Sequence, residues 1–187
     1  MIVAKIDIET TGLLAPDHRI IEVYTSLYKN RKKAFVYDQR IDPQRSISAE
    51  AQRVHGIAYT DLLGKPTWDT VGPVLYKVLE RADLYVWHNG DEFDGPFLDM
   101  EFKRIGLPGL PKRPSIDTMA EGLWATHNGK KPKLAELCFA CGVPYDPAKA
   151  HAASYDVEVM AECFYRGVEW GFFKLPEVAS EEMRLAA

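Results

Sequence analysis

Asp7 and Glu9 stand two positions apart in the stretch KIDIETTGLL, inside a run of apolar, β-branched residues. Side chains at positions i and i+2 of a strand point to the same face, and buried carboxylates are costly unless something pairs with them. No Lys or Arg lies in the TTGLL segment that follows, so the pair suits a divalent cation with oxygen ligands better than a salt bridge. A lone D-x-E pattern is weak evidence, because it occurs by chance on many exposed strands.

A second group of acids lies in the segment HNGDEFDGPFL. We expect a strand to end just before it and a helix to begin with Asp91 as its cap. Asp94 then lies in the first turn, near the carboxyl end of a strand, where open α/β sheets place their sites. The alternative is that Asp91, Glu92 and Asp94 only complement the helix dipole. Asp94 precedes Phe97 and Leu98 at helical spacing, which predicts an inward orientation for Asp94 and a surface position for Glu92.

A third candidate group lies in the segment HAASYDVEVMAECF. Asp156 opens a long predicted helix whose buried side carries Val159, Met160 and Cys163. His151 stands five residues earlier, in a stretch of small residues that we predict as a loop. A single histidine is more often a residue without chemistry, so His151 is a candidate only together with the acids.

Strands are expected to carry or flank these groups. Three successive strands at 2–8, about 20–28 and about 34–41 are joined by short polar turns, and a fourth strand lies at 83–89. Three successive strands, followed by an alternation of helix and strand, predict an α/β fold. Its mixed sheet would be covered by helices on both faces.

Helices are predicted from hydrophobic spacing and from capping residues. The segment SAEAQRVHG is a short helix capped by Ser48 and closed by Gly56, and another helix begins after Thr67 as its N-cap. The acidic segment after Pro176 predicts a last short helix. The remaining helices are expected from Asp91 to Gly106 and at about 117–126, 133–141 and 154–167.

Composition places the chain among soluble globular domains. Its 187 residues are 47% apolar and 27% charged, and no apolar stretch approaches the length that spans a membrane. Charged residues interrupt the apolar start of the chain, which argues against a signal peptide. The odd number of cysteines, Cys138, Cys141 and Cys163, predicts reduced thiols in the cytoplasm. The lone C-x-x-C lacks a second ligand pair for zinc, so packed core thiols are expected.

Charge is distributed unevenly along the chain. The net charge of −4 argues against binding of nucleic acid by electrostatics alone. Residues 103–133 nevertheless hold seven basic and two acidic residues, whereas the rest of the chain holds 16 basic and 25 acidic ones. This basic segment is either a solvated surface or a flank that grips phosphates beside an acidic centre.

Together, the three acidic segments resemble the motifs of the DEDDh group, the DnaQ-like 3′–5′ exonucleases of the ribonuclease H-like superfamily. DIETTGL is similar to the first motif, HNGDEFDGPFL to the second and HAASYDVEVMA to the third. A histidine five positions before the last aspartate marks the His branch; the Tyr branch would need Tyr at position 152, where this chain has Ala. The stretches VHGI, IDT and KLAELCFACGV agree, and the resemblance covers residues 1 to about 168. Val157 departs from the Ala that the family commonly has, at a position that faces packing.

The resemblance implies a ribonuclease H-like fold over residues 1–175, with a mixed five-stranded sheet flanked by helices on both faces, and a short acidic tail over 176–187. It also implies a metal-dependent hydrolase with two Mg²⁺ or Mn²⁺ ions, held by Asp7, Glu9, Asp94 and Asp156. His151 would take the proton from the attacking water. The residues expected to bind the terminal nucleotide are Thr10, Thr11, Gly12, Leu13, Phe93 and His55, although Phe93 equally suits core packing.

The function implied by the resemblance is release of nucleoside 5′-monophosphates from the 3′ end of single-stranded or frayed nucleic acid, with DNA favoured over RNA. An exonuclease that trims RNA or degrades short oligonucleotides is the alternative, because contacts to a 2′-OH are not legible in the sequence. A catalytically inactive binding module is disfavoured because all the motif residues are present. An endonuclease of the same superfamily is disfavoured by His151 and the TTGL segment. A polymerase partner and the oligomeric state stay open.

Overall fold

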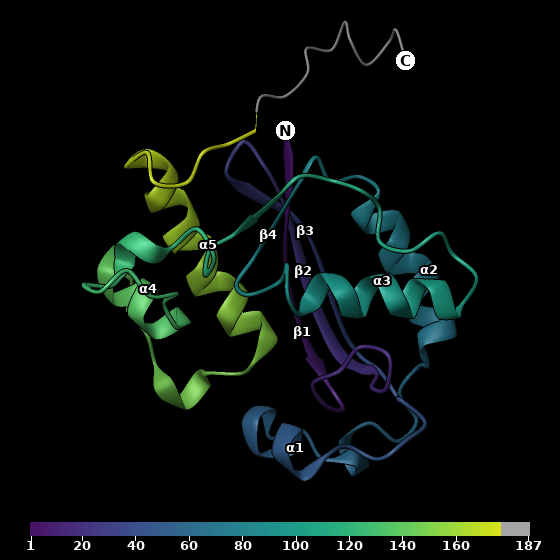
Figure 1. The fold of residues 1–187 in the computed structure, drawn as a ribbon. Coiled ribbons are helices and arrows are strands. Elements are labelled where there is room, and N and C mark those ends of the chain that lie inside the picture. Colours follow the sequence, from purple (N-terminus) through teal and green to yellow (C-terminus); the bar gives the residue numbers. More distant parts are fainter. Residues whose placement is uncertain (177–187) are drawn as a thin grey trace, which may run out of the picture.

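The computed structural model describes residues 1–176, so the last predicted helix lies outside the described residues. A five-stranded sheet with the order β3-β2-β1-β4-β5 forms the centre of the molecule (Figure 1). The mixed sheet predicted from the sequence is confirmed. β1 (Ile2–Thr10), β2 (Ile20–Lys29) and β3 (Lys32–Arg40) pair antiparallel, and β4 (Leu84–Trp87) and β5 (Ser115–Asp117) continue the sheet in parallel from β1.

β1 is the central strand, and its alternating side chains separate two cores. Ala4 and Ile6 pack in one hydrophobic core, and Val3 packs in the other. Because successive side chains of a strand point to opposite faces, Asp7 and Glu9 belong to the same face as Val3. The apolar side chains thus anchor the strand and leave two acids on its second face.

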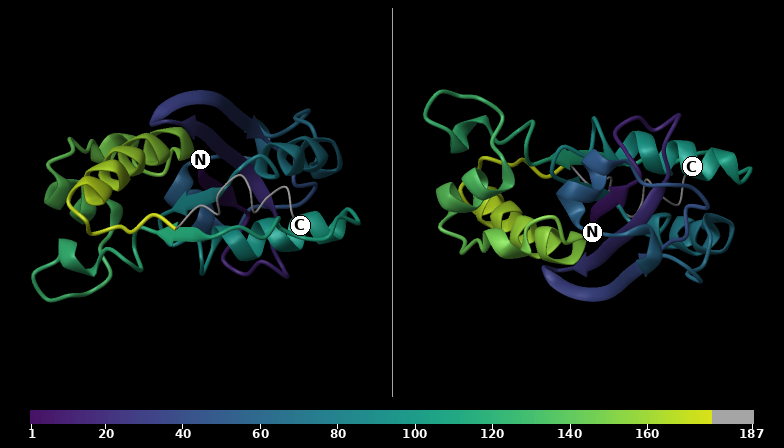
Figure 2. Two further views of the ribbon diagram at one scale, coloured as in Figure 1. Left: turned by 90° about the horizontal axis from the view of Figure 1, so that it is seen from above. Right: turned by 90° about the horizontal axis from the view of Figure 1, so that it is seen from below.

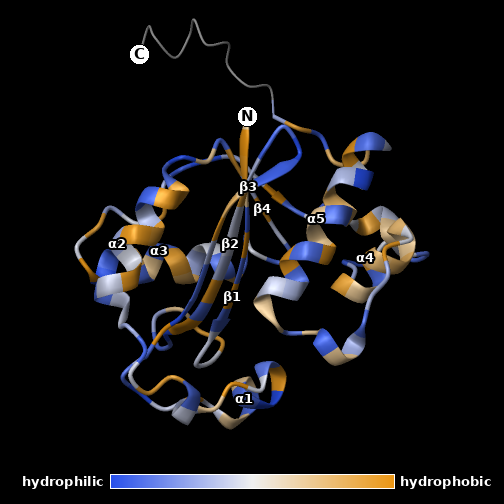
Figure 3. Cartoon of the chain, turned by 180° about the vertical axis from the view of Figure 1, so that it is seen from behind, coloured by the Kyte–Doolittle hydropathy of each residue, from blue (hydrophilic) through white to orange (hydrophobic). Residues whose placement is uncertain are grey.

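Helices cover both faces of the sheet. α2 (Trp68–Leu79) and α3 (Asp94–Arg104) pack on one face, and α4 (Leu134–Cys141) and α5 (Ala153–Glu169) on the other, as the perpendicular views show (Figure 2). These helices carry both hydrophobic and hydrophilic residues (Figure 3), as expected of helices with one buried side. No helix in the described part of the chain is long and apolar enough to cross a membrane.

The short helix α1 (Ala49–His55) lies beyond the end of the sheet at which β1 stops (Figure 1). Ser48 Oγ accepts the amide of Ala51 at 3.1 Å, and Gly56 ends the helix with φ 72. Both predicted caps are therefore confirmed. Single 3-10 turns complete the secondary structure: η1 (Tyr59–Asp61), η2 (Leu123–Ala125) and η3 (Pro147–Lys149).

The helix predicted over residues 117–126 is wrong. Asp117 ends β5 by pairing with β4, and its carboxylate accepts the backbone amide of Met119 at 2.9 Å. Gly122 follows where a Cβ would lie 2.2 Å from the carbonyl oxygen of Thr118. The strand and the tight turn leave only enough chain for the 3-10 turn η2.

The three cysteines are free and buried, as the sequence predicts. They lie between α4 and α5, where the sulfur atoms of Cys138 and Cys163 are 3.6 Å apart. The C-x-x-C segment is thus part of a core and not an exposed redox or zinc motif.

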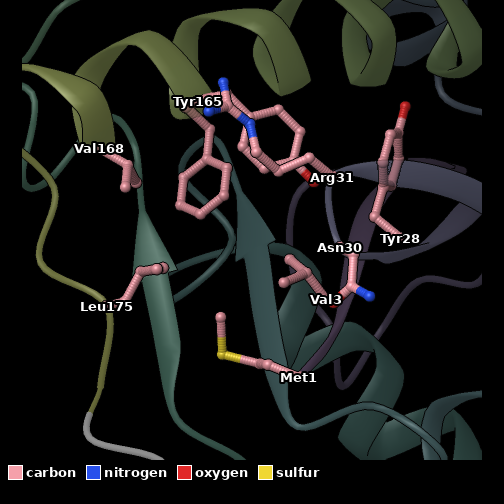
Figure 4. A pocket seen from close by; sticks show the side chains of 9 residues that line it. Met1, Val3, Tyr28, Asn30, Arg31, Tyr165, Val168 and Leu175 are labelled. Atoms are coloured by element: carbon pink, nitrogen blue, oxygen red, sulfur yellow. The ribbon is translucent and has the colours of Figure 1, made fainter.

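A small apolar pocket of about 150 Å³ lies beside the start of β1 (Figure 4). Met1 and Val3 line it together with Tyr28, Tyr165 and Leu175. The two acids of β1 lie toward the opposite end of the strand. This pocket is therefore separate from the predicted site.

Candidate active site

Asp7 and Glu9 are partly exposed on the half of β1 that leads to its C-terminal end. Lys5 lies two residues earlier on the same face, but its ammonium group points elsewhere. It lies 3.6 Å from the ring centre of Tyr28 and 3.7 Å from that of Tyr165, and burial lowers the pKa of Lys5 to about 6. The lysine of the strand is therefore held by two aromatic rings and does not neutralise the acids.

Asp94 is the first residue of α3 and is only 3% exposed. Its position is set by Asp117, whose carboxylate accepts the backbone amides of Asn89 at 2.9 Å and of Asp91 at 3.1 Å. The prediction that Asp91 caps the helix is wrong, because its carboxylate instead accepts the indole N–H of Trp87 at 2.9 Å. The IDT segment thus fixes the turn that brings Asp94 to the site.

Asp156 lies in the first turn of α5, and His151 precedes that helix in an exposed loop. Asp156 Oδ2 accepts the backbone amide of His151 at 3.0 Å. His151 has φ 62, a left-handed conformation that is uncommon for residues other than glycine and that clusters at functional sites. The contact ties the loop to the acid through the backbone and leaves the imidazole free.

The acids from β1, α3 and α5 lie close enough to act on one another. Burial raises the pKa of Asp7, and Asp94, Glu9 and Asp156 raise it further by repulsion. Burial raises the pKa of Glu9 to about 9, with Glu22 as its strongest charged neighbour. Burial also raises the pKa of Asp94 to about 7, and it raises that of Asp156. Ionising all four groups is costly unless positive charge enters the cluster.

The ligand atoms fit a divalent cation. Asp94 Oδ1 and Asp156 Oδ1 are buried and have no hydrogen-bond partner, which calls for an explanation because buried polar atoms are nearly always paired. An all-oxygen set is what Mg²⁺ and Mn²⁺ prefer. Within residues 1–176, no three His, Cys, Asp or Glu side chains are already spaced to hold one ion. Like charges repel, so these carboxylates must turn toward a cation to share it.

Glu22 is a further acid beside the cluster, which reasoning from the sequence missed. It pairs with Glu9 across β1 and β2, and Arg40 on β3 donates to its carboxylate at 2.8 Å. The segment IIEVY contains the signal, because an acid interrupts an apolar strand there as Asp7 does in β1. Arg40 compensates this charge, whereas Asp7 and Glu9 form no ion pair within residues 1–176.

The segment expected to bind the terminal nucleotide follows β1 directly. Thr10 and Thr11 are buried, and their hydroxyl groups serve the loop itself. Thr10 Oγ1 donates to the carbonyl of Gly12 at 2.7 Å, and Thr11 Oγ1 accepts the amide of Arg19 at 3.0 Å. Leu13 is 76% exposed. The apolar side chain of Leu13 is therefore exposed for contact with a ligand, whereas the threonine hydroxyls are engaged within the loop.

Phe93 and His55, the other expected substrate contacts, differ in their surroundings. Phe93 is partly buried and its ring centre lies 4.9 Å from that of Phe97, so the structure favours core packing for this ring. His55 lines an open groove of about 460 Å³ together with His151, Arg40 and Lys65. The groove thus brings together two histidines that lie far apart in the sequence.

The basic segment 103–133 does not form a free cationic flank. Arg104 and Arg113 donate to backbone carbonyl groups. Three of the lysines pair with nearby acids: Lys103, Lys130 and Lys131. Most of these basic side chains are thus engaged in hydrogen bonds or ion pairs within the protein.

Comparison with known proteins agrees with this geometry. The model of the RNase T-type exonuclease family matches residues 5–164. The chain belongs to the DnaQ-like 3′–5′ exonucleases. Members of this family use divalent metal ions, in agreement with the all-oxygen ligand set described above.

Two relatives of this exonuclease are DNA polymerase III proteins. It is 30% identical over 171 residues to the DNA polymerase III subunit epsilon of Escherichia coli strain K12, covering 85% of the chain and 68% of that subunit. It is 31% identical over 163 residues to the PolC-type DNA polymerase III of Halalkalibacterium halodurans. That match covers 87% of the chain but only 11% of the polymerase, so the chain spans about a tenth of that relative.

Two solved structures share the fold of this exonuclease. The complex of E. coli ExoI with single-stranded DNA has a TM-score of 0.80 at 15% identity, over 90% of this chain and 40% of that one. Exonuclease X in complex with 5′ overhanging duplex DNA has a TM-score of 0.66 at 25% identity, over 90% and 93% of the two chains. The predicted ribonuclease H-like α/β fold is confirmed.

Proposed function

We propose that this exonuclease releases nucleoside 5′-monophosphates one at a time from the 3′ end of single-stranded or frayed DNA, with two Mg²⁺ or Mn²⁺ ions. The observation that carries the proposal is the cluster of acids from β1, α3 and α5 beside an exposed histidine. Two of these acids present buried oxygen atoms without a hydrogen-bond partner. Such a cluster suits a pair of cations that bind a scissile phosphate.

Each residue of the cluster has one role in this proposal. The carboxylates of Asp7, Glu9, Asp94 and Asp156 would hold the cations. When bound, the cations supply charge neutralisation at the phosphate and lower the pKa of a bound water. His151 would take the proton from that water, a role that its loop allows because it leaves the ring free to approach a seated substrate.

The nucleotide would be held by the loop after β1. In this proposal the backbone around Gly12 would bind the terminal 3′-OH, and Leu13, which is exposed, would contact the base. Stacking or apolar contact with a base tolerates any sequence, because every base has an apolar face. His55, on the wall of the groove that His151 also lines, would contact the same end of the substrate.

DNA is favoured over RNA because the relatives named above are DNA polymerase III proteins and the exonuclease X complex contains DNA. The same names make a replicative DNA polymerase the partner to test first. Three reduced, buried thiols support a cytoplasmic location.

The test uses three substrates of equal length with a 5′ label: single-stranded DNA, a duplex with a mispaired 3′ end, and single-stranded RNA. In Mg²⁺ or Mn²⁺ we expect stepwise shortening from the 3′ end, fastest on the two DNA substrates. Asp156→Asn is the control that assigns the activity to this site. A faster initial rate on RNA would replace the proposal by an exoribonuclease, and no release of monophosphates from any substrate would overturn it.

A further inference from the structure

The loop that joins β1 to β2 is closed at its base and exposed at its tip. At the base, the amide of Thr11 donates to the carbonyl of Arg19 at 2.9 Å, and the amide of Arg19 donates to Thr11 Oγ1 at 3.0 Å. At the tip, Leu13 and Leu14 are 76% and 62% exposed. The loop lies beside α3 in both orientations (Figures 1 and 2). Because the tip is open to solvent, contacts elsewhere in the loop must fix its conformation.

Arg104, in the last turn of α3, makes more hydrogen bonds to this loop than Arg45, which donates to the carbonyl of Asp17, or Arg19, which donates to that of His18. One terminal nitrogen of Arg104, Nη2, donates to the carbonyls of Ala15 and Pro16, both at 2.7 Å. The other, Nη1, donates to the carbonyl of His18 at 3.1 Å. A single planar guanidinium thus binds three carbonyl groups of one loop.

Glu101 holds the guanidinium of Arg104 in place. It is 2% exposed, its carboxylate lies 3.0 Å from Arg104 Nη1, and the same oxygen accepts the amide of Ile20 at 3.3 Å. The pair connects α3 to both the loop and the start of β2. A lysine offers one compact ammonium group in place of this planar array of donors, so it cannot reproduce these contacts.

We propose that Arg104 is a positioning residue that sets the Thr10–Leu13 segment in the shape that binds the 3′-terminal nucleotide. This inference rests on the proposed function of that segment. A loop ordered in advance spares the ordering cost on binding, and small displacements of a binding loop are costly for catalysis. Arg104 does not touch the substrate in this proposal; it acts through the loop backbone.

Arg113 provides a matched control. Its guanidinium also donates to backbone carbonyls, those of Ala82 at 2.6 Å, Lys112 at 2.8 Å and Glu80 at 2.9 Å. These carbonyls belong to the connections around β4 and β5, away from the loop. Substitution of Arg113 removes the same kind of hydrogen bonds without touching the loop.

The experiment compares Arg104→Lys with Arg113→Lys in the full chain. The readouts are KM and kcat on a single-stranded DNA oligonucleotide, and the ratio of affinities for oligonucleotides that end in a 3′-OH or a 3′-phosphate, measured in Ca²⁺. For Arg104→Lys we expect KM to rise roughly 10- to 100-fold, with a smaller change in kcat and a loss of the preference for the 3′-OH. Arg113→Lys should keep both KM and the preference.

A second variant guards against unfolding. Arg104→Met alone would leave the Glu101 carboxylate buried without its partner, so the double variant Glu101→Gln/Arg104→Met removes both charges. It should show the same loss of end preference. If the wild type is active and Arg104→Lys keeps its KM and its end preference, Arg104 has only a structural role and the inference is wrong. If the wild type releases no monophosphate at all, the proposed function is what fails.

Discussion

At the scale of single residues, the Asp7 carboxylate is unfavourable in the folded protein without metal, so its substitution tests its function. Burial raises the pKa of Asp7, and repulsion from Asp94, Glu9 and Asp156 raises it further. Asp7→Asn should therefore abolish activity and, in metal-free buffer, raise the unfolding temperature. Relief of about 1 kcal/mol corresponds to roughly 2–4 °C for a domain of this size.

Activity assays and thermal unfolding in a chelator check this expectation. Glu162→Gln removes the same charge from the exposed side of α5, where the carboxylate pairs with Arg166, and should leave activity unchanged. Near-normal turnover of Asp7→Asn would remove this residue from the site. A sharply lower unfolding temperature would instead give it a structural role.

His151 is the general base of the proposed reaction. A positioned base contributes roughly 10²- to 10⁴-fold, so His151→Ala should lose about that much in kcat and still bind single-stranded DNA. Steady-state kinetics and a binding assay on the same oligonucleotide separate these two effects. The control is His127→Ala, since His127 is exposed in a separate loop.

Two other histidines sharpen the interpretation of the His151 result. His88 Nδ1 lies 2.9 Å from Thr118 Oγ1, and burial lowers the pKa of His88 to about 4, as suits a residue that holds a turn. His55 shares the groove with His151, and burial lowers the pKa of His55. If His55→Ala lost 10²-fold or more in kcat, roughly the contribution of a general base, and His151→Ala did not, the base would be His55.

At the scale of elements, the sequence predicted best where a pattern is local. β1, the caps of α1 and the start of α5 follow from alternation, Ser48 and Gly56, and helical spacing. Asp91 and the residues after Asp117 were predicted wrongly for one shared reason. The Asp117 carboxylate binds the backbone amide of Asn89, 28 residues away, and that of Met119, and neither contact leaves a periodic signal.

The same limit explains why the sequence did not reveal the roles of Arg104 and Glu22. Both residues lie in elements that the sequence predicts correctly, but tertiary structure brings their neighbours to them. Arg104 meets three carbonyls of the loop, and Glu22 meets Glu9 across the sheet. A charge inside a predicted strand or at the end of a helix shows that a partner is needed. It does not show which one.

The carboxyl groups that β1, α3 and α5 bring together predict how the stability of the protein depends on pH. Carboxyl groups whose pKa is raised on folding favour the protonated form in the native state, so stability is present at low pH and is lost as pH rises. Glu9 moves from 4.5 to about 9 and Asp94 from 3.8 to about 7. The metal-free protein should therefore lose stability between about pH 4 and pH 9.

Unfolding temperatures at pH 5, 7 and 9, with chelator or with Mg²⁺, measure this dependence. Mg²⁺ should stabilise the protein more at pH 9 than at pH 5, because protons compete with the cation for the same carboxylates. Asp7→Asn should flatten the profile. A metal-free stability that rises over the same range would show that these acids do not form one cluster.

At the scale of the whole molecule, the ends of three elements form one face. The loop after β1, the first turn of α3 and the first turn of α5 lie around the C-terminal part of β1 (Figure 1). The groove that His151 lines continues this face toward β2 and β3. Ion pairs elsewhere, such as Arg31–Glu169 and Arg53–Glu50, lie at the surface, where such pairs contribute little to stability. The candidate site thus lies at the end of the sheet where β1 stops.

This arrangement predicts strict dependence on a free 3′ end. The loop after β1 is closed at its base by Thr11 and Arg19, so it suits a terminal nucleotide and not the middle of a strand. Degradation of single-stranded DNA should release 5′-monophosphates and slow by roughly 10²-fold or more when the end carries a 3′-phosphate, since a site that binds a hydroxyl group rejects an analogue lacking it. Removal of that phosphate by a phosphatase should restore the rate. A circular single strand should stay intact under the same conditions, and its cleavage would favour an endonuclease, because an internal cut needs no end for the loop to hold.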